Sequence, residues 1–119
     1  MKSRLAFVVL GLALLPVPAF AHAHLAGSTP ADGSVLTVPP THFLLKFSEA
    51  AHLTALSLRR EGGGKAQQIA PLPTAAGRNF SIIAPKLSAG SFSLSYRVVA
   101  ADDNHLSMGT IRFQLSPAP

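Results

Sequence analysis

The stretch that decides the fold is residues 91–99, which read SFSLSYRVV. Every second side chain is large and apolar, and the side chains between them are mostly serine or arginine. Because successive side chains of a strand point to opposite faces of its sheet, this alternation predicts a strand with one buried face. Residues 110–115, TIRFQL, repeat the pattern and predict a second strand.

Other segments add further strand signals. Residues 43–47, FLLKF, place large apolar side chains on one face, and Leu44 on the other face predicts that this strand is more fully buried. Proline and glycine interrupt the chain between the strand segments and predict turns. The weaker strand candidates are residues 35–38, 53–60, 67–70 and 79–83. The turn signals are residues 30–33 (PADG), 39–40 (PP), 62–64 (GGG), 77–78 (GR) and 89–90 (AG).

Composition agrees with a single all-β domain. The chain has 119 residues, and its 48% hydrophobic and 13% charged content excludes an intrinsically disordered protein. Cysteine is absent, which excludes disulfide scaffolds, thiol nucleophiles and thiolate metal sites. No long stretch has helical periodicity, so we predict a Greek-key antiparallel β-sandwich of the immunoglobulin-like type with about seven strands. A small β-barrel is the alternative.

The N-terminal segment has the composition of a secretory signal peptide. Two basic residues precede the apolar run LAFVVLGLALL at positions 5–15, and positions 19–21 (AFA) have the small residues of a cleavage site. A membrane-spanning helix requires about 20 apolar residues, so this run is too short to be retained as an anchor. We therefore predict a signal peptide over residues 1–21 and one mature domain over residues 22–119, located outside the cytoplasm.

The charge of the chain does not indicate a nucleic-acid partner. Ten basic and five acidic residues give a formal net charge of +5, and loss of Lys2 and Arg4 with the signal peptide lowers it to +3. Only Arg59 and Arg60 are adjacent among the remaining basic residues, and the chain has one tyrosine and no tryptophan. Nucleic-acid surfaces require clustered basic residues, so these charges are expected on a solvated surface. We expect no lipid anchor.

Histidine and aspartate residues form a candidate metal site. Cleavage would make His22 the first residue and free its α-amine, which can bind a metal near neutral pH. Asp103 and His105 lie in the loop between the two clearest strands, and side chains two apart in extended backbone point the same way. An amine, two imidazoles and a carboxylate suit a tetragonal Cu(II) site. Asp102 would point away from this site if the backbone stays extended.

A second geometry uses the same amine. His24 would be the third residue of the mature chain. A free amine, the deprotonated amides of Ala23 and His24, and the His24 imidazole can close a square-planar Cu(II) or Ni(II) site without any fold. The two geometries compete for one amine, so they cannot both be filled. The alternative is that no metal binds here. His22 and His24 would then be two histidines that lie near the terminus by chance, and Asp103 and His105 would belong to a solvated turn.

The other potential ligands are expected to be structural or exposed. His42 and His52 are predicted to lie on the surface or at strand edges. Met108 is the only methionine left after cleavage and is expected to pack near the site, with a role as a weak extra ligand as the alternative. A Cu(I) thioether cluster requires several methionines, and this chain cannot build one.

These features together resemble the CopC family of periplasmic copper-binding proteins. The resemblance covers nearly the whole mature chain, and the initial histidine and the Asp-x-His motif are its most specific parts. The matching segments are HAHL (22–25), STPADG (28–33), FLLKFSE (43–49), LSAGSF (87–92), YRVV (96–99), DNH (103–105) and Gly109 with the closing strand.

The resemblance implies a seven-stranded Greek-key β-sandwich that binds Cu(II) through His22, Asp103 and His105. It also implies a role in copper homeostasis or resistance, in which the protein carries or buffers copper beside a CopD-type inner-membrane importer. The stretch from Val99 to His105 is one residue longer than in the family pattern, so Asp102 is the alternative carboxylate ligand. The missing methionine-rich loop implies a protein that binds only Cu(II).

Two other functions fit parts of the sequence. Copper held by an N-terminal histidine and a second histidine also occurs in polysaccharide monooxygenases, which are copper-dependent oxidative enzymes. A carboxylate in a coordination position and the small mature domain argue against such an enzyme, so we expect a non-catalytic binding protein. A plain immunoglobulin-like interaction module, with incidental histidines, is the remaining alternative.

Overall fold

The computed structural model of the chain describes residues 23–117. The predicted signal peptide and His22 lie outside the described residues, as do residues 118–119. The described part of the chain contains seven strands, and none of its segments is a helix long and apolar enough to cross a membrane. The prediction of an all-β fold with about seven strands is confirmed.

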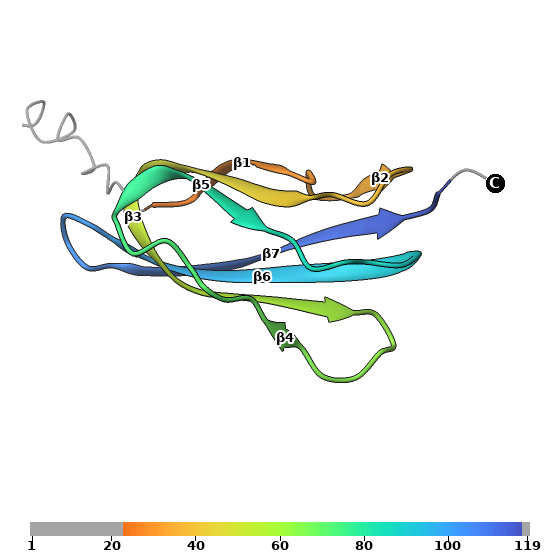
Figure 1. Ribbon diagram of the computed structural model, residues 1–119. Helices are drawn as coiled ribbons and strands as arrows, with labels where there is room; N and C mark the ends of the chain where they lie inside the picture. The colour runs from red at the N-terminus through yellow and green to blue at the C-terminus, as the bar shows by residue number, and fades with distance from the viewer. Residues whose placement is uncertain (1–22, 118–119) are drawn as a thin grey trace, which may run out of the picture.

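The strands form one hydrogen-bonded sheet that folds over into a sandwich of two layers (Figure 1). The strands are β1 (Leu25–Thr29), β2 (Ser34–Leu36), β3 (His42–Arg60), β4 (Gln67–Gln68), β5 (Gly77–Ile83), β6 (Gly90–Ala100) and β7 (Leu106–Leu115). Their order is β1-β3-β6-β7-β2, and both β4 and β5 pair with β3. The two clearest strand predictions correspond to β6 and β7, which form a long antiparallel hairpin.

β3 is the strand that joins the two layers. Its first half pairs with β1 and β5, and its second half pairs with β6 and β4. Its register with β5 shifts between Lys46 and Ala51, where the strand bends without ending. The prediction of two separate strands at residues 43–47 and 53–60 is therefore wrong. Residues 48–52 contain no glycine or proline that would break the strand, so it continues through the bend.

Two strands differ in detail from the expected pattern. β1 has only one large apolar residue, Leu25, so its alternation is too weak to predict a strand. Antiparallel hydrogen bonds to β3 supply its stability instead. β2 runs parallel to β7, and it is the exception to the antiparallel pairing that we predicted. The turn at residues 30–33, where Gly33 has a φ of 82°, leads the chain into this position.

The core lies between the two layers and is apolar. The largest contributions come from alternating residues of three strands: Phe43, Leu45 and Phe47 of β3, Phe92, Leu94 and Val98 of β6, and Ile111, Phe113 and Leu115 of β7. Leu44 is 44% exposed, so the expectation that both faces of this segment are buried is wrong. The outer face of β3 is open to solvent here, and only the face toward the second layer is covered.

Tyr96 lies at the edge of the core beside Gly109 of β7. Its ring packs edge-on against Phe47 with ring centroids 5.4 Å apart, and burial raises the pKa of its hydroxyl. A Cβ atom added to Gly109 would lie 2.6 Å from Cζ of Tyr96, well inside van der Waals contact. Gly109 is therefore required for space.

Replacing Gly109 by alanine is expected to lower the free energy of unfolding by about 1–3 kcal/mol, the usual cost of overpacking. The overlap involves ring carbons as well as the hydroxyl, so Tyr96→Leu should recover part of this loss and Tyr96→Phe should not. Urea-induced unfolding of the single and double variants measures the coupling. Equal losses from Gly109→Ala in the wild-type and Tyr96→Leu backgrounds would contradict the steric explanation.

Candidate metal centre

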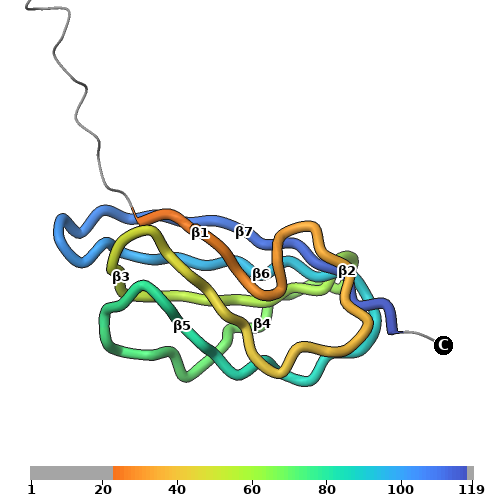
Figure 2. Tube along the Cα trace, turned by 90° about the horizontal axis from the view of Figure 1, so that it is seen from above, coloured from red at the N-terminus to blue at the C-terminus, as the bar shows by residue number. Residues whose placement is uncertain are grey.

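β1 and β6 lie along the same edge of β3. At Lys46, β3 pairs with both β1 and β5, so these two strands occupy opposite edges. At Ala51, β3 pairs with both β5 and β6, so β6 also lies opposite β5. Both β1 and β6 run antiparallel to β3. The start of β1 therefore meets the end of β6 at the bend of β3, and the β6–β7 hairpin lies at the same end of the molecule (Figure 2).

Hydrogen bonds from the main chain of both segments hold them on the bend of β3. The His24 amide donates to Ser48 Oγ (3.1 Å), and the Ser48 amide donates to the His24 carbonyl (2.9 Å). The Ala101 amide donates to the Ala50 carbonyl (2.9 Å). Ser48 and Ala50 are two residues apart, which is about 7 Å along a strand. The N-terminal segment and the β6–β7 loop are therefore neighbours in the fold.

The β6–β7 loop is a tight turn with a defined backbone. Asn104 has a positive φ of 57°, a conformation that asparagine tolerates, and its amide donates to the Ala100 carbonyl (3.1 Å). The Ala100 amide donates to the His105 carbonyl (2.9 Å). Oδ1 of Asp103 accepts a hydrogen bond from the His105 amide (3.0 Å). The expected extended backbone is therefore wrong here, but the turn itself brings the Asp103 carboxylate to His105.

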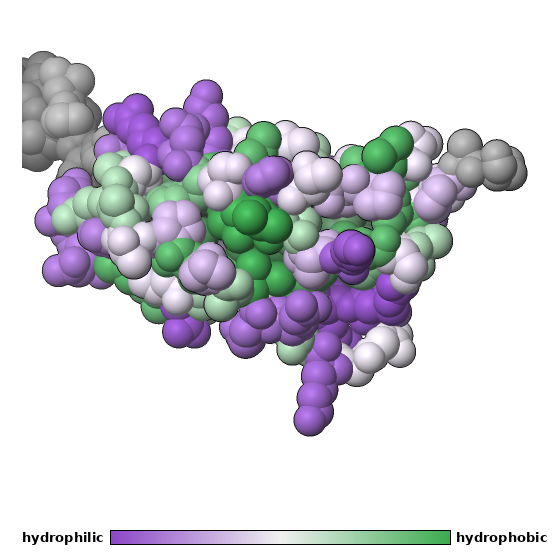
Figure 3. All heavy atoms as spheres, viewed as in Figure 1, coloured by the Kyte–Doolittle hydropathy of each residue, from purple (hydrophilic) through white to green (hydrophobic). Residues whose placement is uncertain are grey.

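The side chains of the candidate donors are exposed. His24, Asp102, Asp103 and His105 all lie on the surface, and Figure 3 shows hydrophilic atoms over the end formed by the hairpin. A carboxylate that accepts one hydrogen bond keeps other lone pairs for a cation. Within residues 23–117, no three His, Cys, Asp or Glu residues form a group that could hold a metal. His22 lies outside the described residues, so the structure joins the Asp103 carboxylate to the backbone amide of His105 and does not place His22.

Ser48 and Glu49 also lie at this end, and neither was predicted to be a site residue. Ser48 makes the two hydrogen bonds to His24, and Glu49 is a half-buried acidic residue between the two β3 positions that hold the N-terminal segment and the loop. The sequence contains one feature that could have identified Glu49. After the inward-facing Phe43, Leu45 and Phe47, the next position of the alternation is Glu49, an acidic residue where the pattern predicts an apolar one.

The other potential ligands are separate from the hairpin end or face solvent. His42 and His52 are both exposed on β3, as predicted. His42 pairs with Ile83 at the far end of the first half of β3. Met108 is 64% exposed, so the expectation that it packs is wrong. It pairs with the exposed Arg97 on the outer face of the sheet, where no layer covers it.

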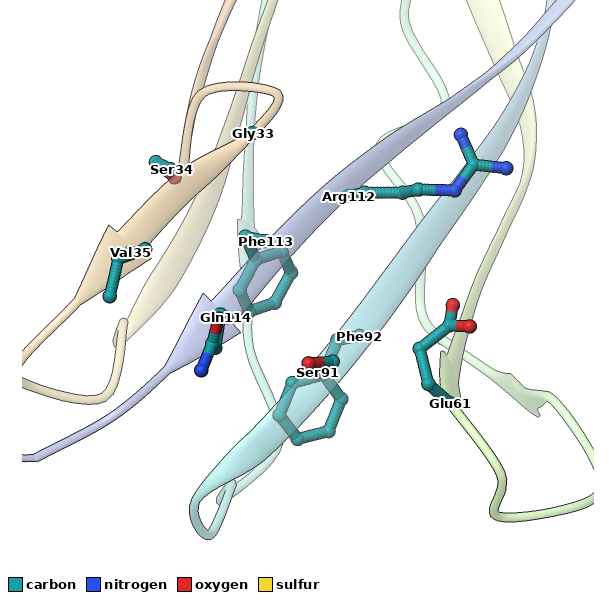
Figure 4. A pocket seen from close by; sticks show the side chains of 9 residues that line it. All are labelled: Gly33, Ser34, Val35, Glu61, Ser91, Phe92, Arg112, Phe113 and Gln114. Carbon is teal, nitrogen blue, oxygen red and sulfur yellow. The ribbon is translucent and has the colours of Figure 1, made fainter.

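A surface pocket of about 260 Å³ lies at the opposite end of β6 (Figure 4). The rings of Phe92 and Phe113 stack there with centroids 5.4 Å apart, and Glu61 and Arg112 supply the charged groups. Nine residues of strand (92–100) separate Ser91 from the hairpin loop, a distance of roughly 30 Å. None of the residues that line the pocket is a histidine. The pocket is therefore not part of the candidate metal centre.

The fold and the site define a class of protein: a small β-sandwich with histidine and carboxylate side chains at the end where its first strand begins. The CopC domain family matches residues 25–116 of the chain. The chain therefore belongs to the CopC family, as its motifs predicted. This is a family of copper-binding resistance proteins.

Solved structures of similar proteins agree with this assignment. CopC from Methylosinus trichosporium OB3b has a TM-score of 0.70 and 20% sequence identity, over 82% of this chain and 97% of that chain, and supports the fold. PcoC, a methionine-rich copper resistance protein from Escherichia coli, has a TM-score of 0.60 and 27% identity, over 81% of this chain and all of that chain (100%). Curated protein sequences give no match.

Proposed function

We propose that the chain is exported to the periplasm, loses residues 1–21 and binds one Cu(II) ion through His22, Asp103 and His105. In this role it carries or buffers copper for copper homeostasis or resistance. Membership of the CopC family supports copper as the ligand. The composition of the N-terminal segment supports export and cleavage.

The observation that carries this proposal is the meeting of the N-terminal segment with the β6–β7 loop. His24 and Ala101 are hydrogen-bonded to Ser48 and Ala50, which are neighbours along β3. Two residues of chain span at most about 7 Å. The proposed ligand at position 22 lies outside the described residues and precedes His24 by two positions in the sequence. A site shared between the two segments requires this proximity.

The donor set suits Cu(II). The α-amine and imidazole of His22 belong to one residue, so binding of one already places the other close to the ion. The His105 imidazole and the Asp103 carboxylate would complete a nitrogen-rich tetragonal set, and Cu(II) forms the most stable complexes with such donors among divalent first-row metals. The hydrogen bond from the His105 amide to Asp103 favours Asp103 as the carboxylate. Asp102 in the same turn is the alternative.

The composition favours Cu(II) over Cu(I). Cu(I) prefers thioether and thiolate ligands, and such sites draw on several methionines or cysteines. The mature chain has no cysteine and one methionine, Met108, which lies on the outer face of β7. PcoC, by contrast, is described as methionine-rich. We infer that this chain handles copper in the oxidised state.

The exposure of the donors suits a carrier. A metal held by surface side chains can pass to another protein without unfolding of the sandwich, and His105 and Asp103 lie on a loop outside the core. We propose an inner-membrane importer of the CopD type as a recipient. The donor side chains at the hairpin end would face this partner.

Mass spectrometry of the exported protein, with and without Cu(II), tests the proposal directly. The expected result is a chain that begins at His22 and gains the mass of one copper ion under conditions that preserve folded proteins. The amine ligand exists only if cleavage occurs after Ala21, so a different first residue contradicts the proposed site. A chain that begins at His22 but retains no copper after desalting contradicts the proposed function.

A further inference from the structure

The backbone of His24 is held on β3 from both sides. Its amide donates to Ser48 Oγ (3.1 Å), and its carbonyl accepts from the Ser48 amide (2.9 Å). The preceding residue, Ala23, is fully buried and belongs to the apolar core. The N-terminal segment is therefore fixed to the sandwich up to position 23, directly after the proposed first ligand. This arrangement affects which copper geometry the N-terminus can adopt.

The square-planar Cu(II) geometry at the chain terminus uses the His24 amide nitrogen, the atom that is hydrogen-bonded to Ser48, as a ligand. In that geometry the nitrogens of Ala23 and His24 bind Cu(II) directly, and each amide releases its proton to solvent. The His24 nitrogen then has to turn toward the metal, together with the amine and the His24 imidazole, and therefore away from Ser48 Oγ. The hydrogen bond to Ser48 and this geometry therefore exclude each other.

We infer that Ser48 is a positioning residue that keeps the His24 backbone nitrogen turned toward β3 and so directs Cu(II) to the set formed with Asp103 and His105. This inference rests on the proposed copper site at the N-terminus. Ser48 need not contact the metal, because it acts through the backbone of His24. Its second hydrogen bond, from its own amide to the His24 carbonyl, stays in place when the hydroxyl is removed.

Cu(II) affinity in a His105→Ala background tests this role. Loss of His105 weakens the internal set, and the residual copper is expected in the terminal geometry, where His24→Ala removes it. Adding Ser48→Ala should tighten this residual site about five-fold, because the terminal geometry no longer has to break one ordinary hydrogen bond. Competition titration against a Cu(II) chelator measures the affinity. Electron paramagnetic resonance and the visible copper band identify the geometry in each variant.

Two matched variants separate this role from a general loss of structure. Ser48→Thr keeps a hydroxyl at the same position and should leave the residual affinity unchanged. Ser95→Ala removes a serine that bonds Thr110 on the β6–β7 pair, away from the bend, and should have no effect. A merely structural role for Ser48 would weaken copper binding in every background, and it would not tighten the residual site.

The outcomes distinguish this inference from the proposed function. If the wild-type chain binds copper through His105 but Ser48→Ala leaves both the residual affinity and the spectra unchanged, the inference about Ser48 is overturned. If the wild-type chain and His105→Ala bind copper equally, the proposed copper site itself is contradicted, whatever Ser48→Ala does. Tightening in Ser48→Ala, with rescue by Ser48→Thr, supports the inference.

Discussion

Replacement of His105 by alanine is expected to lower the affinity of the mature protein for Cu(II) by at least about 100-fold. Loss of a residue that only orients a ligand already costs about 10–100-fold, and His105 is proposed to bind the ion directly. The imidazole lies on the loop that β6 brings to the bend of β3, next to the N-terminal segment. Competition titration of wild-type and variant proteins against a chelator of known affinity measures the loss.

His42→Ala is the matched control for this prediction. His42 is also an exposed histidine, but it begins β3 and pairs with Ile83, far from the bend. Its replacement should leave the affinity within about two-fold of wild type, because surface substitutions away from a site have small effects. A comparable loss in His42→Ala would mean that copper binds through unspecific surface histidines. A His105→Ala protein with wild-type affinity would remove the hairpin loop from the site.

Replacement of Phe47 by alanine is expected to lower the free energy of unfolding by about 3–5 kcal/mol, the usual cost of removing a buried aromatic side chain. Phe47 is 1% exposed, and its ring packs edge-on against Phe80 (6.0 Å between centroids) and Tyr96 (5.4 Å). It therefore links β3, β5 and β6 just before the bend. Domains of this size have a total stability of about 5–15 kcal/mol, so the loss is a large fraction of it.

Ile83→Ala provides the comparison for Phe47→Ala. Ile83 is also a large apolar residue, but it is 74% exposed at the end of β5. Its replacement should change the free energy of unfolding by no more than about 0.5 kcal/mol. Urea-induced unfolding of the metal-free protein, followed by circular dichroism, gives both values. Similar losses in the two variants would contradict the assignment of Phe47 to the centre of the core.

The strands with strong alternation were predictable from local sequence. β6 buries alternating side chains over most of its length and β7 does so over its second half, and this pattern depends only on the geometry of a single strand. The glycine at position 33 and the prolines at positions 39–40 likewise predicted where strands end. The predicted strands and turns agree with the structure at these positions because the local sequence preference and the tertiary fold require the same conformation.

Predictions failed where long-range pairing overrides the local pattern. β3 continues through its bend because β5 on one edge and β1 and then β6 on the other pair with it up to and beyond the bend. β1 has little apolar alternation and forms a strand through its hydrogen bonds to β3. Met108 is exposed because no layer covers the outer face of β7 at that position. None of these features is encoded within a window of a few residues.

The sequence by itself determined the all-β class, the apolar faces of the main strands and the chemical types of the candidate donors. These follow from side-chain chemistry and from the period of two along a strand. Only the tertiary structure decided that the start of β1 and the end of β6 share one edge of β3, so that the segment at His24 lies beside the loop that carries His105. About 80 residues separate these segments in the chain, and hydrogen bonds to a common third strand bring them together.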